Sequence, residues 1–430
     1  MKIFLLLSLL TTLSAQAANV IFVHPDGAGI SQWQATRMFL KGPDGELNWD
    51  RLPHIGIYRG HMLDSLSATS NGGATTHAYG VKVSRNGFGS NNSPDPPIAA
   101  SGKPESLMQE AQRRGLRVGL INSGSIIEPG TAAFVASVEK RSESEEITRQ
   151  VIESNVDIIM SGGEEWLLPE GEIGKHGGKG KRSDKRNLIN EAKERGYAVV
   201  FTKEELAAVP KDTKKLLGVF ANEHTFNATS ESELRKKNTP HYNPEAPTLA
   251  EMTAKALELF GSDKFFLVVE EEGSDNFGNN LNARGVFESL RRTDETYGLI
   301  LNYIETHPDT LLLTAADSSA SGLDVIGLQP KNLTHSLFGA LGNDFSGASY
   351  ETDNGKPFKA APDQFGRELP FVVVWGSRHD AAGGIVARAA GAGAEAVKGS
   401  IDNTQIYSIM RRALFNDTRK KEPSCCLKSK

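Results

Sequence analysis

The chain has 430 residues and a formal net charge of −5 at pH 7, from 48 Lys and Arg against 53 Asp and Glu. This mildly acidic balance gives no basic stripe, which argues against a nucleic-acid-binding module. The two cysteines, Cys425 and Cys426, are adjacent in a polar stretch, so they do not form a disulfide framework. Any metal site must therefore use oxygen or nitrogen ligands.

The first segment, MKIFLLLSLLTTLSAQA, has the pattern of a secretory signal peptide. One Lys precedes an apolar run from Ile3 to Leu10, and small residues stand at Ala15 and Ala17. We expect cleavage near Ala17, and hence a periplasmic or secreted protein. The apolar part is too short to span a bilayer, and no later run of about 18 apolar residues follows, so we expect no membrane span.

Short apolar runs rich in β-branched residues recur along the rest of the chain and predict buried strands. They lie at 19–24, 117–122, 156–161, 197–202, 215–220, 264–269, 310–316 and 369–376. Helical patterns separate many of them, such as the one over 247–261, which opens with Pro and stops at Gly. Strands buried on both faces and alternating with helices predict an α/β fold around a mostly parallel sheet.

Two stretches interrupt this alternation. The segment at 170–186 is polar and rich in Gly and Lys, and 318–365 is largely irregular. The length exceeds the ~250–300 residues of one simple core, so two domains or one large domain with insertions are both open. We expect a single catalytic domain over 18–416, with surface insertions at about 162–196 and 318–365, and a polar tail over 417–430.

Acids and hydroxyls follow the carboxyl ends of several predicted strands, where open α/β sheets bind ligands. They are Asp26, Glu128, Thr131, Glu270, Asp275 and Asp317. A single acid at a strand end is as well explained by contact with water. Several acids on one edge repel one another unless a positive charge lies among them, and hard divalent cations are the simplest counter-charge.

The segment SATSNGGATTHAYGVK, at 67–82, places small and hydroxyl residues before a helix-compatible run. A Ser at such a junction lies in the field of unpaired N–H groups, which suits a nucleophile that attacks a phosphate. From the pattern alone, an ordinary helix cap followed by a Gly-containing turn is the better explanation. A Ser/His/Asp triad is a rival, but no G-x-S-x-G elbow supports it, and the Gly-rich segments lack nucleotide-binding signatures.

Together, and in the same order, these segments resemble the alkaline phosphatase family. The matching motifs are HPDGAG, TSNGGATTHAYGVK, SIIEPGTAAFVASVEKR, VDIIMSGGEEWLLP, PTLAEMTAKALELF, LLLTAADSS and DNTQIYSIMRRAL, together with Glu270 and Asp275 five residues apart. The resemblance runs from about Val20 to Leu414. It implies a three-layer sandwich with a mostly parallel central sheet, and an alkaline-phosphatase-type hydrolase of phosphate esters.

The resemblance also implies roles for particular residues. Ser70 would be the attacking hydroxyl and Arg141 would hold the phosphate. The implied metal ligands are Asp26, Glu128, Thr131, Glu270, Asp275 and Asp317. Thr69 stands where many members carry Asp, and Glu271 and Glu272 receive no role.

The chain departs from the family at three His ligands of its zinc-dependent members. Asn279 and Ser318 occupy two of those positions and are the candidate ligands there. No His stands at the third position, for which Asp353 or Asp363 is the candidate substitute. This oxygen-rich set predicts Mg²⁺ with Zn²⁺, or Mn²⁺ or Ca²⁺ in a harder site.

The sequence thus predicts metal-dependent hydrolysis of small phosphomonoesters through a phosphoserine at Ser70. A phosphodiesterase or sulfatase on the same scaffold remains open. So do a non-catalytic periplasmic phosphate- or metal-binding protein and a structural Ca²⁺ site. The resemblance also implies a homodimer, although no exposed apolar helix argues for one.

Overall fold

The structure, a computed structural model, describes residues 18–227, 229–236, 239–328 and 349–416. The predicted signal peptide at 1–17 and the polar tail at 417–430 lie outside these residues. Among the helices of the described ranges, none is long and apolar enough to cross a membrane.

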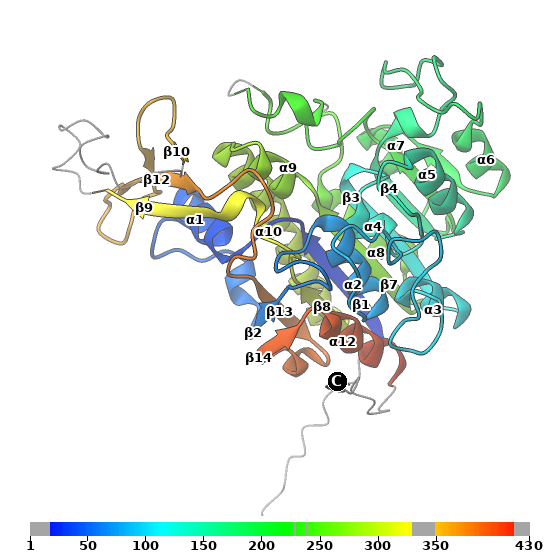
Figure 1. Ribbon diagram of the computed structural model, residues 1–430, viewed down its shortest axis with the longest axis horizontal. Helices are drawn as coiled ribbons and strands as arrows, with labels where there is room; N and C mark the ends of the chain where they lie inside the picture. Colours follow the sequence, from blue (N-terminus) through cyan, green and yellow to red (C-terminus); the bar gives the residue numbers. More distant parts are fainter. Residues whose placement is uncertain (1–17, 228, 237–238, 329–348, 417–430) are drawn as a thin grey trace, which may run out of the picture.

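A ten-stranded sheet forms the centre of the molecule, in the order β14-β2-β13-β8-β1-β7-β3-β4-β6-β5 (Figure 1). Its strands are β1 (Asn19–Pro25), β2 (His54–Arg59), β3 (Arg117–Ser125), β4 (Ile158–Gly162), β5 (Ala198–Val200), β6 (Leu216–Val219), β7 (Phe265–Glu271), β8 (Thr310–Thr314), β13 (Val386–Gly391) and β14 (Gly399–Asp402). Only β13 runs antiparallel to its neighbours among these strands. The predicted α/β fold with a mostly parallel sheet is confirmed.

Helices cover both faces of this sheet. They are α1 (Ile30–Lys41), α2 (Ser70–Tyr79), α3 (Leu107–Arg113), α4 (Pro129–Ala132), α5 (Ser144–Glu153), α6 (Leu188–Glu194), α7 (Lys203–Ala208), α8 (Leu249–Phe260), α9 (Gly273–Asn279), α10 (Ala283–Thr306) and α12 (Thr404–Phe415). Short 3-10 turns are η1 (Trp49–Arg51), η2 (Glu164–Trp166), η3 (Glu231–Glu233), η4 (Ala320–Gly322) and η6 (Ala394–Ala396). Helices α2, α3, α4 and α12 pack together, whereas α1, α8, α9 and α10 form a separate packed group. The central strands between these layers are fully buried, as their apolar sequences require.

Two helices show how the sequence fixes their ends. In α8, the Thr248 side chain accepts from the backbone N–H of Glu251, whose carboxylate accepts from the Thr248 N–H, and the helix stops at Gly261. The helix predicted over 247–261 is confirmed. Helix α2 begins at Ser70 and ends at Tyr79, and the next residue, Gly80, has a left-handed φ of 69° that favours glycine.

A second, antiparallel sheet lies at one end of the molecule (Figure 1). It contains β9 (Leu323–Gly327), β10 (Ser349–Glu351), β11 (Phe358–Lys359) and β12 (Pro370–Trp375). The strand predicted at 369–376 is confirmed as β12, which pairs with β9, β10 and β11 and not with the main sheet. An apolar run predicts a buried strand but not which sheet it enters. The expected insertion at 318–365 supplies three of these strands.

Candidate metal centre and active site

The predicted acids meet at the carboxyl edge of the four central strands. Because β1 and β7 are parallel neighbours, their register sets His24 beside Glu270. On the other side of β7, β3 sets Asn122 beside the same Glu270. Asp26 follows β1 directly, and Asp317 follows β8, which is the other neighbour of β1. Residues from four separate segments therefore share one small region.

These acids are buried rather than solvated. The exposed fractions are 0% for Asp26 and Glu270, 1% for Asp317, 5% for Glu128 and 8% for Asp275. A strand end that merely reaches water would leave its acid exposed. Burial of so many carboxylates is unfavourable unless cations or protons neutralise them.

Several ligand atoms in this region receive no hydrogen bond from the described part of the chain. They are both carboxylate oxygens of Asp26 and of Asp317, Oε1 of Glu270, Oε2 of Glu272, Oγ of Ser318 and Nε2 of His24. Buried polar atoms in proteins are nearly always paired. Divalent cations fit this set of donor atoms, because hard ions take carboxylate oxygens as ligands. We call these residues, with Glu128, Thr131 and Asp275, the acid cluster.

The acids raise one another's pKa. Burial, and then the charge of Asp26, raise the pKa of Glu270 and that of Asp317 well above their usual ranges. Burial and then the charge of Glu128 do the same to the pKa of Glu272. The protein without cations therefore holds protons in this cluster that the unfolded chain would release.

This arrangement predicts a pH dependence of stability that cations remove. Below the ordinary carboxyl pKa of about 4, folded and unfolded chains are both protonated at these positions. As the pH rises above that value, the unfolded chain releases its protons first, so the free energy of unfolding falls. We expect the melting temperature of chelator-treated protein to fall by a few degrees between about pH 5 and pH 8.

Thermal melts with and without saturating Mg²⁺ or Mn²⁺ check this expectation. Surface carboxylates titrate alike in both samples, so the difference between the two melting curves isolates the cluster. A difference that stays constant across this pH range would contradict the assignment.

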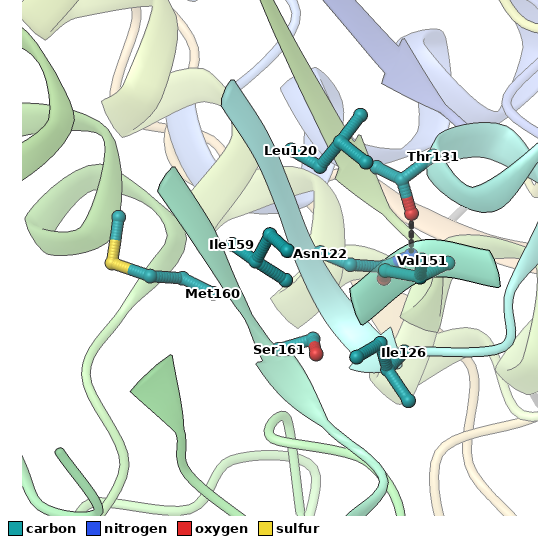
Figure 2. A pocket seen from close by; sticks show the side chains of 8 residues that line it. All are labelled: Leu120, Asn122, Ile126, Thr131, Val151, Ile159, Met160 and Ser161. Atoms are coloured by element: carbon teal, nitrogen blue, oxygen red, sulfur yellow. Dashed lines mark hydrogen bonds between the residues drawn. The ribbon is translucent and has the colours of Figure 1, made fainter. Parts of the chain in front are cut away.

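Thr131 and Asn122 hold one side of Glu270. The Asn122 amide donates to Oγ1 of Thr131 over 2.9 Å and to Oε2 of Glu270, and the Thr131 hydroxyl donates to the same Oε2 over 3.2 Å. Figure 2 shows Asn122 and Thr131 in the wall of a small, mostly apolar cavity. Its volume of about 10 Å³ is barely enough to admit one water molecule. This cavity is too small for a phosphate ester, so it is a packing void beside the residues that contact Glu270.

Ser70 stands at the first residue of α2 and is 3% exposed. Gly73, one turn later on the same face, lies against Asp317: a Cβ there would be 2.3 Å from the Asp317 Cβ. His77, a further turn on, has its ring centroid 5.5 Å from that of His24. The face of α2 that carries Ser70 therefore runs along the acid cluster, and Gly73 permits this close approach.

Arg141 lies at the other side of the cluster. Its guanidinium donates to Oε2 of Glu128 over 2.7 Å, while its side chain remains 46% exposed. A guanidinium in this position neutralises part of the charge of a buried acid and keeps donors directed to solvent. The structure thus puts Arg141 beside a predicted metal ligand, at a point that a dissolved substrate can reach.

Asn279 links Asp275 to Asp380, an acid that no motif in the sequence indicated. The Asn279 amide donates to both carboxylate oxygens of Asp275, over 3.0 and 3.1 Å, and to Oδ1 of Asp380 over 3.0 Å. Burial and then the charge of Asp380 raise the pKa of Asp275 well above its usual range. Asp380 therefore lies beside two of the predicted metal ligands and is a further candidate ligand.

The two residues suggested for the position of the missing third His are held elsewhere. Asp353 forms an ion pair with Arg284, whose guanidinium donates to both of its carboxylate oxygens. Asp363 accepts hydrogen bonds from the backbone and guanidinium of Arg367. Neither carboxylate is brought to the acid cluster in the structure.

Three residues of the site were missed by sequence reasoning: Glu272, His24 and Asp380. The three successive glutamates divide between two sides of the sheet edge. Glu271 accepts from the Ser123 hydroxyl and the Gly273 N–H, whereas Glu272 lies near Glu128, Asp26 and Glu270. Alternation along a strand could have separated Glu271 from its neighbours. No local signal pointed to Asp380.

Comparisons with known proteins agree on one family. The family model described as alkaline phosphatase matches residues 17–415. The chain is 26% identical over 439 residues to an alkaline phosphatase of Escherichia fergusonii, covering 93% of this chain and 86% of that protein. It is 24% identical to a streptomycin-6-phosphate phosphatase of Streptomyces griseus, covering 93% of this chain and 91% of the relative.

Solved structures show the same fold. The alkaline phosphatase of Thermus thermophilus superimposes with a TM-score of 0.71 at 20% identity, covering 94% of this chain and 92% of that one. The alkaline phosphatase of the Antarctic bacterium TAB5 gives 0.68 at 18% identity, covering 93% and 98%.

Proposed function

Because this chain belongs to the alkaline phosphatase family, a family of phosphoric ester hydrolases, we propose that it hydrolyses phosphomonoesters through a phosphoserine on Ser70. One observation carries the proposal. Ser70 opens a helix whose next turn packs against Asp317, and the buried oxygens of Asp317 receive no hydrogen bond from the described residues. A nucleophile candidate and a cation site thus lie side by side.

The residues that would hold the cations extend the set proposed from sequence. They are Asp26, Glu128, Thr131, Glu270, Asp275, Asn279, Asp317 and Ser318, to which we add Glu272 and Asp380. When bound, divalent cations would favour ionisation of the attacking hydroxyl and offset charge on the phosphate. An oxygen-rich set with an amide and a hydroxyl in place of imidazoles, and with Asp380, favours Mg²⁺, Mn²⁺ or Ca²⁺ over Zn²⁺.

The reaction then takes two steps at Ser70, and neighbouring groups bind the phosphoryl group. Oγ of Ser70 forms a bond to phosphorus as the ester P–O bond breaks, and the leaving alcohol departs with a proton. Water then breaks the Oγ–P bond, which releases phosphate and restores the Ser70 hydroxyl. The positive end of the dipole of α2, at whose first residue Ser70 lies, favours the negative charge of the phosphoryl group. The partly exposed guanidinium of Arg141 can donate two hydrogen bonds to phosphate oxygens.

We further propose that residues 18–416 form one catalytic domain with insertions, and that the protein acts in the periplasm or is secreted. The signal-peptide pattern over 1–17 supports the location. A homodimer stays a prediction of the family resemblance.

Hydrolysis rates on three chromogenic substrates test the proposed reaction. The protein is stripped of metals, resupplied with Mg²⁺, Mn²⁺, Ca²⁺ or Zn²⁺, and given a phosphate monoester, a phosphate diester or a sulfate monoester. We expect kcat/KM on the monoester to exceed the other two by roughly 10²-fold or more, with Mg²⁺ or Mn²⁺ more effective than Zn²⁺.

A faster rate on the diester or the sulfate would replace this proposal by another activity on the same scaffold. If cations bind tightly and none of the substrates is cleaved, the protein binds phosphate or metal without turnover.

A further inference from the structure

His24 is the one imidazole of the acid cluster. It lies on β1, and Asp26 follows two residues later, just after the strand ends. Because the Asp26 N–H still donates to the Glu271 carbonyl of β7, the alternation of the strand continues and both side chains are on the same face. Its exposed fraction is 0%. One ligand atom each from His24, Asp26 and Glu270 all lie within 4.8 Å of one another. That separation is compatible with a single ion held between them.

The hydrogen bond to one ring nitrogen leaves the other available. Nδ1 of His24 lies 3.0 Å from the carbonyl oxygen of Ala315, which can only accept, so Nδ1 carries the proton. Nε2 receives no hydrogen bond from the described ranges, and it lies 3.9 Å from Oδ1 of Asp26 and from Oδ1 of Asp317. A ring nitrogen whose partner nitrogen donates to a carbonyl is the usual arrangement of a metal-binding His.

The surroundings fix this orientation of the ring. The His77 ring packs edge-on against it, with 75° between the ring planes, and His77 is itself held by the Tyr58 hydroxyl over 2.7 Å. Opposite, Gly130 approaches so closely that a Cβ there would lie 2.6 Å from the Cδ2 of His24 and 2.0 Å from the Oε1 of Glu270. Gly130 thus leaves the space in which His24 and Glu270 face each other.

We infer that Nε2 of His24 is an additional ligand for a divalent cation, shared with Asp26 and Glu270. The inference rests on the proposed function only in requiring that the acid cluster binds a cation. One nitrogen among many oxygens makes the site more acceptable to Mn²⁺ and Zn²⁺, which take imidazole ligands, and matters little to Mg²⁺, which prefers oxygen. His24 would partly offset the missing imidazoles at Asn279 and Ser318.

Electron spin echo envelope modulation spectroscopy of the full-length protein loaded with Mn²⁺ tests whether a nitrogen is bound to the ion. We expect modulation from a directly bound ¹⁴N, replaced by the ¹⁵N pattern when histidine is isotopically labelled. His24→Asn keeps a donor for the Ala315 carbonyl but has no atom at the Nε2 position, so the nitrogen signal should vanish. His241→Asn, in a half-buried His that packs against Phe277, should keep it.

Affinities measured by competition with a metal indicator give a second readout that is independent of activity. We expect His24→Asn to weaken Mn²⁺ and Zn²⁺ about ten-fold or more, and Mg²⁺ less. A His24→Gln variant, whose amide reaches nearer the Nε2 position, covers the case in which the Asn variant does not fold.

The outcomes separate the two proposals. If Mn²⁺ binds but gives no ¹⁴N modulation, or if the modulation survives in both His24 variants, then His24 is not a ligand and pairs with the carboxylates instead, while the proposed function stands. If the wild-type protein binds no divalent cation, both proposals fail.

Discussion

Ser70→Ala lowers kcat on a phosphate monoester by roughly 10³-fold or more, and leaves cation binding intact. Alanine lacks the oxygen that would form the bond to phosphorus, so water would have to attack the ester directly. The helix should survive, because Thr69 and not Ser70 precedes α2, and no side-chain cap is lost. Steady-state kinetics, together with metal titration of the same variant, check this expectation.

The matched control is Ser144→Ala. Ser144 is also the first residue of a helix, α5, and is 7% exposed, but it stands outside the acid cluster. We expect its kcat to stay within about a factor of two of wild type, since the lost hydroxyl belongs to a residue outside the acid cluster. If Ser70→Ala retained turnover at full cation occupancy, the phosphoserine mechanism would be wrong.

Asp26→Asn abolishes turnover and cation binding together. The side chain keeps its size, so the change removes a charge and little else. Both oxygens of Asp26 are buried and receive no hydrogen bond from described residues, and its charge raises the pKa of Glu270 and Asp317. A residue at the centre of the cluster should contribute to more than one ion, and we expect cation affinity to fall by at least about 100-fold.

Metal content by mass spectrometry and affinity by calorimetry measure this loss. Asp294→Asn is the control, because Asp294 is buried at 6% exposure but accepts from the Trp49 N–H, away from the cluster. Full cation binding by Asp26→Asn would contradict the assignment of Asp26 as a metal ligand. Within the same series, Asp380→Asn should weaken binding about ten-fold, whereas Asp353→Asn should leave it unchanged.

Much of the fold could be predicted because its signals are local. The apolar runs of β1, β7 and β8 are buried on both faces, and the capping residues of α8 mark its limits in the sequence itself. In an open α/β sheet, ligands bind at the carboxyl ends of the strands. Asp26, Glu270 and Asp317 could therefore be predicted to lie at one edge, because parallel neighbouring strands present their carboxyl ends together.

The remainder of the site depends on tertiary placement. Asp380 follows β12, a strand of the small second sheet, and reaches Asn279 from about a hundred positions away in the chain. No periodicity or spacing encodes that contact. His24 is different: its spacing of two from Asp26 put both on one face of β1, a signal that was present but not used.

Acid quenching during turnover, followed by peptide mapping of the quenched protein, shows where the phosphoryl group resides. With Mg²⁺ or Mn²⁺ and a phosphate monoester, we predict the mass of one phosphoryl group on the peptide that contains Ser70, and its absence in Ser70→Ala. Turnover without a phosphorylated peptide, or with the phosphoryl group on another residue, would contradict the mechanism.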